Sequence, residues 1–475
     1  MISVNKQRLK YIIGDYVSSN IAWCLFNVIR YYFIGNIINI QGYKTLNTFL
    51  CSPNVMLGQL FFPMAMMFVY YLSGYYNQVF TKSRLQEFST TVISSFINAL
   101  LLFFTALIND LFVERIFNYE LILMLWGILF VMVYTVRYMI TDVASRKIHN
   151  REWKFDTLII GNSCQARAFE SQLSSMDRSL GYNIVGYVNI PKENAVKESH
   201  LPVYELDELA EVCEAQKIKE LLIVPSKCNA GILFNVVNKL FPLNLPIKIS
   251  PDMFNILVTR VKISNICGEP LVDISGASMS ASSINLKRTL DVVMSIFAMI
   301  ILSPIYILLA LMIKIDSSGA IIYKQERVGY HNAIFNIYKF RTMIKNAEES
   351  GCPLLSSEND DRVTHLGRFL RKYRLDELPQ FWNVLKGDMS LVGPRPERQY
   401  YIDQIIKEAP YYTLLHQVRP GITSMGMVKY GYACNVSEMI KRLRYDLIYI
   451  ENMSLMNDMK IMIYTVKTVI TGKGL

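Results

Sequence analysis

The stretch LDVVMSIFAMIILSPIYILLALMIKI, residues 290–315, decides the architecture of this 475-residue chain. It is long enough to cross a bilayer as a helix, which takes about 20 apolar residues. Pro304 interrupts it, because proline lacks the N–H of the helical ladder and its ring clashes with the preceding turn. Ser303 can satisfy a carbonyl that this kink frees. The stretch therefore predicts either a kinked spanning helix or two helices that enter and leave on one membrane face.

Four apolar stretches upstream predict a membrane bundle. Each is close to the ~20 residues that span a bilayer as a helix, and they are residues 11–34, 55–76, 90–109 and 119–141. The chain is 52% hydrophobic yet 19% charged, a balance that indicates a membrane part joined to a soluble part. Residues 1–150 are therefore predicted to form a four-span transmembrane bundle.

Positive charge predicts the orientation of this bundle, because cytoplasmic loops carry an excess of Lys and Arg. Basic residues gather before the first stretch, between the second and third, and after the fourth: Lys6, Arg8, Lys10, Lys82, Arg84, Arg137, Arg146, Lys147, Arg151 and Lys154. The opposite side offers only Arg30, Lys44 and Arg115. We therefore expect both ends of the bundle, and the chain that follows it, in the cytoplasm. Basic residues flank residues 290–315 on both sides, so charge does not orient that stretch.

The remaining totals exclude some function classes. The net charge of +10 suits a protein that rests on anionic lipid headgroups or handles phosphorylated substrates. No nucleic-acid-binding motif accompanies it, so nucleic acid is not an expected partner. The eight cysteines form no Cys-x-x-Cys or zinc pattern and are expected as free thiols in a reducing compartment. No small-residue cleavage site follows the first apolar stretch, so we expect no removable signal sequence.

Residues 151–282 are predicted to form a Rossmann-like α/β domain. The runs FDTLIIG (155–161) and ELLIVP (220–225) are typical of buried strands, and VYELDELAEVCEAQKIKE (203–220) has helical spacing. A dinucleotide site requires Gly-x-Gly-x-x-Gly after the first strand, where this chain has GNSCQA (161–166). This degenerate turn favours a structural or regulatory module over a nucleotide site.

Short basic motifs follow this domain in the chain. They are YKQERVG (323–329), FNIYKFRTM (335–343) and DRVTHLGRFLRKYRLDELPQ (361–380). The first two are typical of strand edges, and the third of an arginine-rich helix, a break and a new helix. Pro379 suits the first turn of that new helix. Asp376 and Glu377 are therefore expected at its N-terminus.

Two interpretations fit Asp376 and Glu377. Both acids can simply cap a helix, which stabilises it by about 1 kcal/mol. Successive helical residues project about 100° apart, so the pair can instead divide the chemical work. A helix N-terminus favours an ionised carboxylate, which keeps Asp376 available as a nucleophile toward phosphorus. Glu377 can then ligate a hard cation such as Mg²⁺ beside substrate phosphates.

Nearby cations favour the chemical interpretation. Transfer from a diphosphate requires positive charge on the transferring and leaving phosphates. The candidate cations are Lys339, Arg341, Arg362 and Arg371. Arg395 lies between Pro394 and Pro396, whose fixed φ reduces the entropy cost of presenting its guanidinium. A solvated basic face is the alternative for any one of these cations.

From Lys287 to the C-terminus the chain resembles the bacterial monotopic phosphoglycosyl transferases, which begin envelope polysaccharides on polyprenyl phosphate. The matching segments are KRTLD (287–291), the Ser303-Pro304 break, QERVG (325–329), KFRTM (339–343), DRVTHLGRFLRK (361–372), LDELPQFWNVLKGDMSLVGPRPE (375–397), RPGIT (419–423) and YDLIYIENMSL (445–455). The spans and the middle domain resemble the large members of that family. The resemblance implies an α-rich monotopic catalytic domain over residues 283–475, with a re-entrant membrane helix at about 288–315.

The resemblance also implies a two-step reaction that starts from a UDP-sugar. Asp376 attacks the β-phosphate, releases UMP and keeps the phosphosugar, which polyprenyl (undecaprenyl) phosphate then takes. Glu377 matches the family's magnesium position, and Arg395 matches the arginine that contacts the nucleotide. Phosphate-side positions match at Lys339, Arg341 and Arg371. A bacterial inner-membrane location with the catalytic domain on the cytoplasmic face, and a homodimer, are further implications.

The chain departs from the family pattern at a few positions. The family usually continues the PGIT motif with Gly and then Ala-Gln-Val, whereas residues 423–428 here are TSMGMV. Ser424 and Met427 occupy the places concerned, and the departure bears on sugar preference. Arg374 stands where a small hydroxyl residue is common.

Two other functions stay open. A membrane-bound nucleotide-sugar dehydratase or epimerase would need a Tyr-x-x-x-Lys pair and an intact glycine-rich turn, and the sequence has neither. A non-enzymatic scaffold of a polysaccharide assembly complex would be favoured by a decayed site. The intact Asp376-Glu377 pair and the Pro-Arg-Pro segment argue against decay. No pattern identifies the sugar or the polymer.

Overall fold

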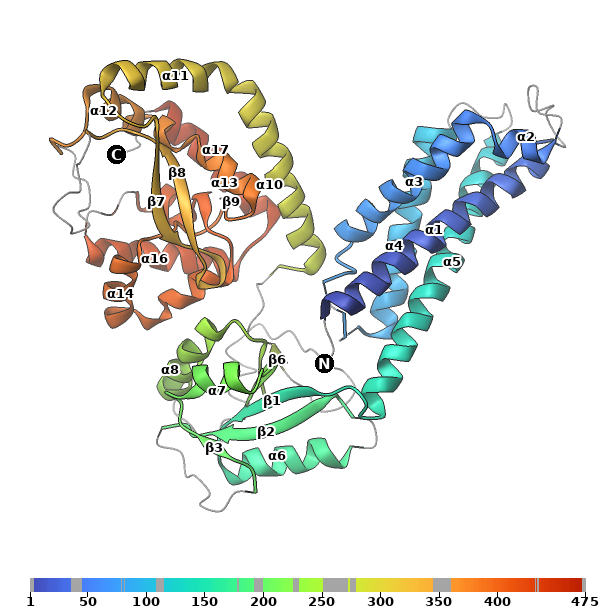
Figure 1. The fold of residues 1–475 in the computed structure, drawn as a ribbon, viewed down its shortest axis with the longest axis horizontal. Helices are drawn as coiled ribbons and strands as arrows, with labels where there is room; N and C mark the ends of the chain where they lie inside the picture. Colours follow the sequence, from blue (N-terminus) through green and yellow to red (C-terminus); the bar gives the residue numbers. More distant parts are fainter. Residues whose placement is uncertain are drawn as a thin grey trace. The chain divides into compact units, whose positions relative to one another are not determined.

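The computed structural model describes residues 4–35, 45–77, 79–80, 82–107, 115–176, 179–191, 200–224, 230–250, 272–273, 279–344, 360–431, 433 and 435–471. The chain divides into two units (Figure 1). The first contains Met1–Lys154, Met176–Gly181 and Ser280–Asn285, and the second Phe155–Ser175, Tyr182–Met279 and Leu286–Leu475. Several predicted features lie outside the described residues: Lys44, residues 108–109, Pro225, Cys228, Cys267, Cys352 and Cys434. The described cysteines Cys24, Cys51, Cys164 and Cys213 are free thiols, as predicted.

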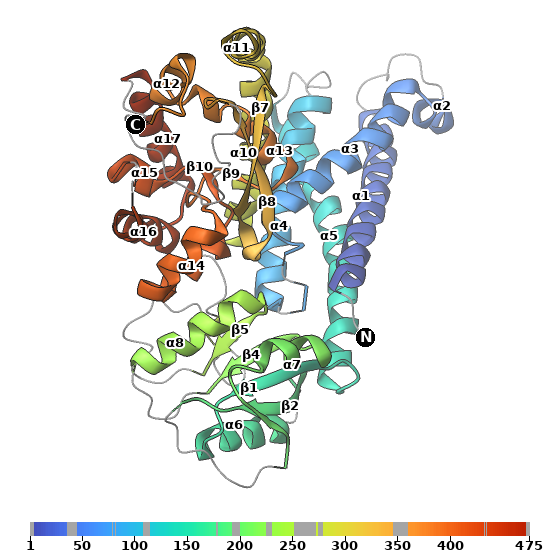
Figure 2. The same cartoon turned by 60° about the vertical axis from the view of Figure 1, so that its left-hand side comes forward.

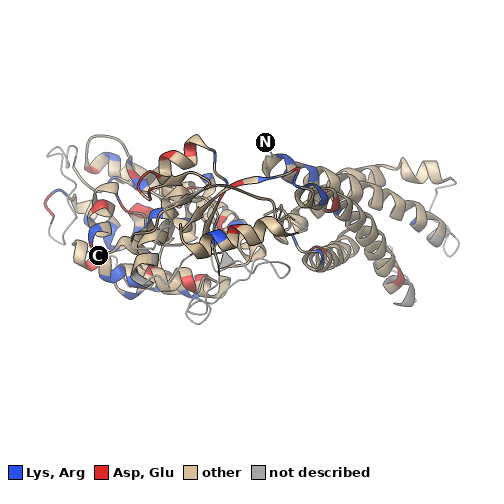
Figure 3. Ribbon diagram, turned by 90° about the horizontal axis from the view of Figure 1, so that it is seen from below, with Lys and Arg blue, Asp and Glu red and all other residues tan. Residues whose placement is uncertain are grey.

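The first unit contains the predicted membrane bundle. Within the described residues, four single helices are long and apolar enough to cross a membrane. The helices of this unit are α1 (Val4–Gly35), α2 (Leu46–Leu50), α3 (Pro53–Leu72), α4 (Arg84–Leu102), the π-helical η1 (Phe103–Leu107) and α5 (Arg115–His149). Phe26, Met66 and Leu125 pack in a shared core, whereas Phe61 and Phe104 are exposed, as side chains that contact lipid would be. Charged residues are sparse along much of these helices and gather near the N-terminus (Figure 3).

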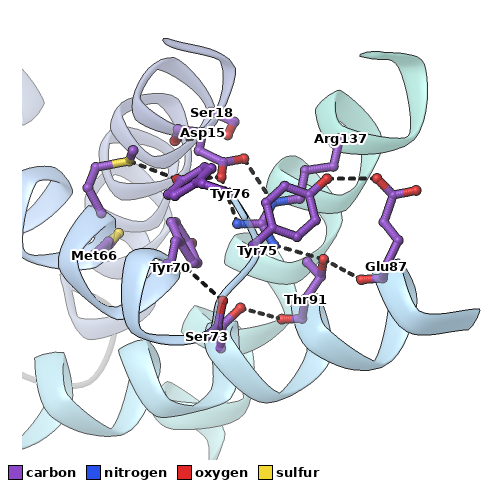
Figure 4. A network of polar contacts seen from close by, with 12 residues as sticks. Asp15, Ser18, Met66, Tyr70, Ser73, Tyr75, Tyr76, Glu87, Thr91 and Arg137 are labelled. Atoms are coloured by element: carbon purple, nitrogen blue, oxygen red, sulfur yellow. Dashed lines mark hydrogen bonds and ion pairs between the residues drawn. The ribbon is translucent and has the colours of Figure 1, made fainter. Parts of the chain in front are cut away.

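One charged cluster lies inside the bundle (Figure 4). Arg137 of α5 is fully buried and donates to Asp15 of α1 through Nε at 2.9 Å and Nη2 at 2.7 Å. Its Nη1 donates to Thr91 Oγ1 of α4 at 3.0 Å, and the Tyr76 hydroxyl donates to Asp15 Oδ2 at 2.7 Å. A charge inside a membrane bundle is tolerated only when it is paired, because no water solvates it. The ion pair therefore ties α1, α4 and α5 together.

The second unit contains the predicted parallel sheet, with strand order β3-β2-β1-β4-β5-β6. Its strands are β1 (Phe155–Ile160), β2 (Tyr182–Val188), β3 (Val203–Tyr204), β4 (Glu220–Ile223), β5 (Ile247–Ile249) and β6 (Val272–Asp273). Only β6 pairs antiparallel, with β5. Helix α6 (Cys164–Ser175) lies on one face, and α7 (Leu209–Ala215) and α8 (Ala230–Leu240) on the other (Figures 1 and 2). This is the doubly wound arrangement expected of a Rossmann-like domain.

The helix expected over residues 203–220 is shorter than its pattern indicates. Val203–Tyr204 pairs with β2 as an edge strand, and only Leu209–Ala215 is helical. Lys217 then adopts a left-handed φ of 54°, which a continuing helix cannot contain. The prediction was wrong at both ends because pairing with a neighbouring strand outweighs local helical spacing.

Residues 290–315 lie in two helices, α10 (Ala281–Ile301) and α11 (Ser303–Asp316), bent by 62° at the break. The carbonyl of Ile300 would normally accept from the N–H four residues later, but that residue is Pro304. Ser303 Oγ donates to this carbonyl instead, at 2.8 Å. The predicted break and its repair are confirmed, whereas re-entry into the membrane stays a prediction.

The chain after α11 forms a β-hairpin and many short helices. The hairpin strands, β7 (Ile322–Val328) and β8 (Ile334–Phe340), are antiparallel and coincide with two of the predicted strand-edge motifs. The elements that accompany this hairpin after α11 are η4 (Tyr330–Asn332), α12 (His365–Lys372), η5 (Leu375–Glu377), α13 (Gln380–Lys386), β9 (Ser390–Val392), α14 (Gln399–Glu408), η6 (Pro410–Gln417), β10 (Gly421–Thr423), α15 (Met425–Lys429), α16 (Val436–Glu451) and α17 (Leu455–Ile470). One further short helix, η3 (Phe241–Leu243), follows α8 in the parallel-sheet part of the unit. Val384, Met389, Ile405 and Leu443 are among the residues of the main apolar core of the chain after α11. This part of the second unit is rich in helix, as predicted.

Candidate active site

The two acidic neighbours lie in a tight turn of their own. Asp376 and Glu377 were predicted at the N-terminus of the helix that is α13, and they belong to the 3₁₀ turn η5, which lies directly before that helix. Arg374, directly before the turn, has φ 53° and ψ 26°, a left-handed conformation that redirects the chain after α12. Pro379 is consequently the N-cap residue of α13. Both acids are only 8% exposed.

Two cations from distant segments hold Glu377. Lys339 Nζ, on β8, donates to Glu377 Oε1 at 2.9 Å, and Arg395 Nη2 donates to the same oxygen at 3.2 Å. Burial alone would raise the pKa of Glu377, but Lys339 and Arg395 outweigh it and hold this pKa well below its ordinary value. These two cations therefore favour the ionised form of Glu377.

Asp376 has the opposite electrostatic environment. Burial raises the pKa of Asp376 to about 6, and the Glu377 carboxylate adds to this effect while Lys339 opposes it. Desolvation, rather than a helix N-terminus, dominates the electrostatic environment of Asp376, so its ionised form is favoured less strongly than the sequence predicted. Asp376 is mostly ionised at neutral pH but poorly solvated. A carboxylate in that state is suited to nucleophilic attack.

The predicted phosphate ligands divide into two groups. In the first group, Lys339 and Arg395 contact Glu377. Arg371 belongs to this group too, because it lies close enough to lower the pKa of Asp376. The Nε of Arg371 donates to Thr342 Oγ1 at 2.9 Å. The other two face different partners. Arg341 Nη2 donates to the carbonyl of Ser317 at 2.6 Å, beyond the C-terminal end of α11, and Arg362 Nη2 pairs with Asp360 Oδ2 at 2.6 Å. A phosphate-binding role for Arg341 and Arg362 stays a prediction that these contacts do not favour.

The segment from Pro394 to Pro396 is anchored on both sides of Arg395. Gly421 N donates to the carbonyl of Pro394 at 2.9 Å. Arg327 Nη1 donates to the carbonyl of Pro396 and to Glu397 Oε2, both at 3.1 Å. Arg442 of α16 pairs with the other oxygen of Glu397, which is 5% exposed. The sequence analysis did not predict that Glu397 and Arg442 anchor this segment. The position of Glu397, directly after the Pro-Arg-Pro segment, was a signal that could have indicated such a role.

A sulfur atom borders the same cluster. Met427 of α15 is 5% exposed, and its Sδ lies 3.3 Å from Arg395 Nη1. Arg374 Nη1 lies 3.9 Å from the same sulfur. Two of the departures noted in the sequence, Arg374 and Met427, therefore contact each other beside the candidate active site.

The two acids fit Mg²⁺ only with help from a substrate. The described residues contain no group of three or more His, Cys, Asp or Glu side chains that could hold a metal by themselves. Proteins usually bind Mg²⁺ through one or two carboxylates together with substrate phosphates and water. The low pKa of Glu377 keeps it ionised and therefore competent as such a ligand.

These features define a class of protein. Four apolar helices of the described residues suit a membrane, and the second unit presents a buried carboxylate with a raised pKa, a second carboxylate whose ionised form is favoured, and converging cations. Such a constellation suits transfer of a phosphorylated group by a membrane-associated protein.

Comparison with known proteins identifies the family. A family model described as "Bacterial sugar transferase" matches residues 282–472, and one described as "CoA-binding domain" matches residues 72–251. The undecaprenyl-phosphate galactose phosphotransferase of Salmonella typhimurium is 32% identical over 351 residues, which cover 68% of this chain and 69% of that protein. The chain belongs to the bacterial sugar transferase family.

Other relatives share shorter segments. The UDP-N-acetylgalactosamine-undecaprenyl-phosphate N-acetylgalactosaminephosphotransferase of Aeromonas hydrophila is 39% identical over 231 residues, 49% of this chain. The UDP-glucose:undecaprenyl-phosphate glucose-1-phosphate transferase of Escherichia coli is 33% identical over 289 residues, 60% of this chain. The chain spans 54% and 62% of the length of these two relatives, less than two thirds of either. A UDP-D-quinovosamine 4-dehydrogenase structure from Vibrio fischeri covers 26% of this chain and 93% of that chain at 11% identity with a TM-score of 0.21, too slight a likeness to establish a shared fold.

Proposed function

We propose that this chain transfers a sugar-1-phosphate from a UDP-sugar to undecaprenyl phosphate, and thereby begins synthesis of capsule, O-antigen or exopolysaccharide. The observation that carries the proposal is Asp376, a buried carboxylate with a raised pKa, beside the cluster of Glu377, Lys339 and Arg395. The names of three relatives contain undecaprenyl phosphate as the acceptor, and two of them contain a UDP-sugar as the donor.

The proposed reaction has two displacements at one phosphorus atom. An Asp376 carboxylate oxygen bonds to the β-phosphorus, and the bond from that phosphorus to the bridging oxygen breaks, so that UMP leaves with the bonding electrons. A phosphate oxygen of undecaprenyl phosphate then attacks the same phosphorus and releases the Asp376 carboxylate. Lys339 and Arg395 present positive charge where the diphosphate is cleaved. Separating the two displacements lets a water-soluble donor and a lipid acceptor use the site in turn.

Mg²⁺ would be held by Glu377 together with the donor phosphates, and it would neutralise part of their charge. Glu377 suits this role because Lys339 and Arg395 keep it ionised. Its Oε1 already accepts from both cations, so these contacts also orient the carboxylate.

A donor panel tests the function. Purified protein with Mg²⁺ and undecaprenyl phosphate should release UMP from one preferred donor among UDP-glucose, UDP-galactose, UDP-N-acetylglucosamine and UDP-N-acetylgalactosamine. The same reaction should yield a lipid-linked sugar diphosphate, and a chelator should stop it until Mg²⁺ is restored. Failure to release UMP from any UDP-sugar would contradict the proposal.

We further propose that α10 and α11 re-enter the cytoplasmic leaflet of a bacterial inner membrane, so that the site faces the cytoplasm. The 62° bend and the exposed apolar side chains of Phe297 and Leu308 support this arrangement. A homodimer stays a prediction.

Cysteine labelling distinguishes re-entry from crossing. In a variant without native cysteines, single cysteines in place of the exposed residues Glu152, Ser318 and Lys407 should all react from the cytoplasmic side with a membrane-impermeant maleimide. Glu152 precedes the bent pair and the other two follow it, so Glu152→Cys is the matched reference. If α10 and α11 cross the membrane, Ser318→Cys and Lys407→Cys will react from the face opposite to Glu152→Cys.

A further inference from the structure

Two guanidinium groups converge on one sulfur atom beside the carboxylates. Arg395 Nη1 and Arg374 Nη1 lie 3.3 Å and 3.9 Å from Met427 Sδ. A thioether is a weak hydrogen-bond acceptor, whereas a guanidinium binds anionic oxygens with strong, charge-assisted hydrogen bonds. The two arginine nitrogens are therefore directed at an atom that an anionic oxygen can replace with a net gain in interaction energy.

The backbone conformation of Arg374 indicates that its side chain has a role at this site. Its φ of 53° is uncommon for residues other than Gly, Asn and Asp, and such a conformation costs on the order of 1 kcal/mol or more. Glycine or asparagine would adopt it with less strain.

Met427 suits the role of a replaceable occupant. It is buried on α15, where its backbone N–H donates to Ser424 Oγ at 3.0 Å, so the main chain is fixed. Its side chain is unbranched and flexible, and can move aside when a ligand enters. Glutamine at this position would offer an amide oxygen that competes with an anion for the same donors.

We propose that Arg374 and Arg395 form a clamp for one phosphate group, in which a phosphate oxygen displaces the Met427 sulfur. The clamp rests on the proposed function and deepens it, because it adds Arg374 to the residues that bind substrate. The phosphate belongs either to the UDP-sugar or to the lipid acceptor, and both have the same chemistry at this point. Within the clamp, Arg374 only binds substrate, whereas Arg395 also presents positive charge where the diphosphate is cleaved.

Two variants separate the side chain of Arg374 from its backbone. Arg374→Gly and Arg374→Asn both tolerate the left-handed conformation while they remove the guanidinium. Steady-state kinetics would be measured with each substrate varied while the other is saturating. We expect the KM of the clamped substrate to rise about tenfold, as for the loss of one charge-assisted hydrogen bond, with kcat within about twofold. A rise in the UDP-sugar KM identifies the donor phosphate, and a rise in the undecaprenyl phosphate KM identifies the acceptor phosphate.

Variants of Met427 provide a second, independent test of the clamp. Met427→Leu keeps the volume and the apolar character and offers no hydrogen-bond acceptor, so its effect on either KM should be smaller than that of Met427→Gln. Met427→Gln should raise the KM of the same substrate as the Arg374 variants do, because its amide competes with the phosphate. Arg368→Asn, on the exposed side of α12, is the matched control for loss of an arginine and should change neither KM.

The outcomes distinguish failure of the clamp from failure of the proposed function. If the wild type turns over and Arg374→Gly and Arg374→Asn keep both KM values, Arg374 has only a structural role and the clamp is overturned. If the wild type releases no UMP from any donor, the proposed function fails, and direct titration with UMP and with undecaprenyl phosphate then decides the clamp. About tenfold weaker binding of either ligand by Arg374→Gly supports it, and equal binding of both overturns it.

Discussion

Asparagine in place of Asp376 should abolish UMP release and leave the fold intact. The side-chain amide cannot form the acyl-phosphate, so we expect turnover to fall by at least about a thousandfold. Burial raises the pKa of Asp376, which means that the folded protein holds this negative charge at a cost. The neutral asparagine removes that cost, and the apparent Tm in detergent should therefore not fall.

The control for this experiment is Asp403→Asn, which removes an exposed carboxylate from α14 and should keep full turnover. A direct readout comes from mass spectrometry of enzyme quenched after mixing with donor but without undecaprenyl phosphate. The phosphosugar should be found on the peptide that contains Asp376. An adduct on another residue, or normal turnover by the asparagine variant, would rule out Asp376 as the nucleophile.

Loss of Asp15 should destabilise the membrane bundle more than loss of any surface carboxylate. Asp15→Ala leaves the guanidinium of Arg137, which is fully buried, without the partner that accepts from its Nε and Nη2. Removing one member of a buried ion pair costs about 3–5 kcal/mol, because the remaining charge stays desolvated. We expect a lower apparent Tm in detergent and less protein in the membrane fraction.

The same bundle contains a matched surface pair. Asp142 Oδ2 lies 2.7 Å from Arg146 Nε, and the Arg146 side chain is 77% exposed. Arg84 Nη2 also donates to Asp142 Oδ1 at 2.8 Å, and the Arg84 side chain is 40% exposed. Asp142→Ala should cost no more than about 1 kcal/mol, because water solvates both arginines that remain. The double variant Asp15→Leu with Arg137→Met should recover much of the lost stability, since no buried charge is then unpaired. If Asp15→Ala is no less stable than Asp142→Ala, the buried pair does not hold the bundle together.

Local sequence predicted the elements whose stability depends on local properties. Apolar runs of membrane-spanning length gave the four long helices, although α4 begins at Arg84, six residues before the predicted start. The Ser303-Pro304 break was predictable because a missing N–H and a neighbouring hydroxyl act within one helical turn. The helix expected over residues 203–220 failed where a contact distant in sequence, the pairing of Val203–Tyr204 with β2, competed with local spacing.

The candidate site was only partly predictable for the same reason. Residue types and motifs singled out Asp376, Glu377 and Arg395, but not the partners of each side chain. Arg341 lies two residues from Lys339 in the sequence, yet it binds the end of α11 while Lys339 contacts Glu377. Lys339 is on β8, whereas Arg341 follows the last residue of that strand, Phe340, so alternation along the strand does not determine the direction of Arg341.

The sequence by itself determined the membrane-spanning segments, the proline break and the acidic pair, since hydropathy, a missing N–H and side-chain chemistry are properties of a residue and its near neighbours. Only the tertiary structure decided that Lys339 and Arg395 share one oxygen of Glu377, that burial raises the pKa of Asp376, and that Arg374 and Arg395 meet at the sulfur of Met427. These features arise from contacts between segments far apart in the chain. The strength of these hydrogen bonds and electrostatic interactions depends on how much water the packed elements exclude.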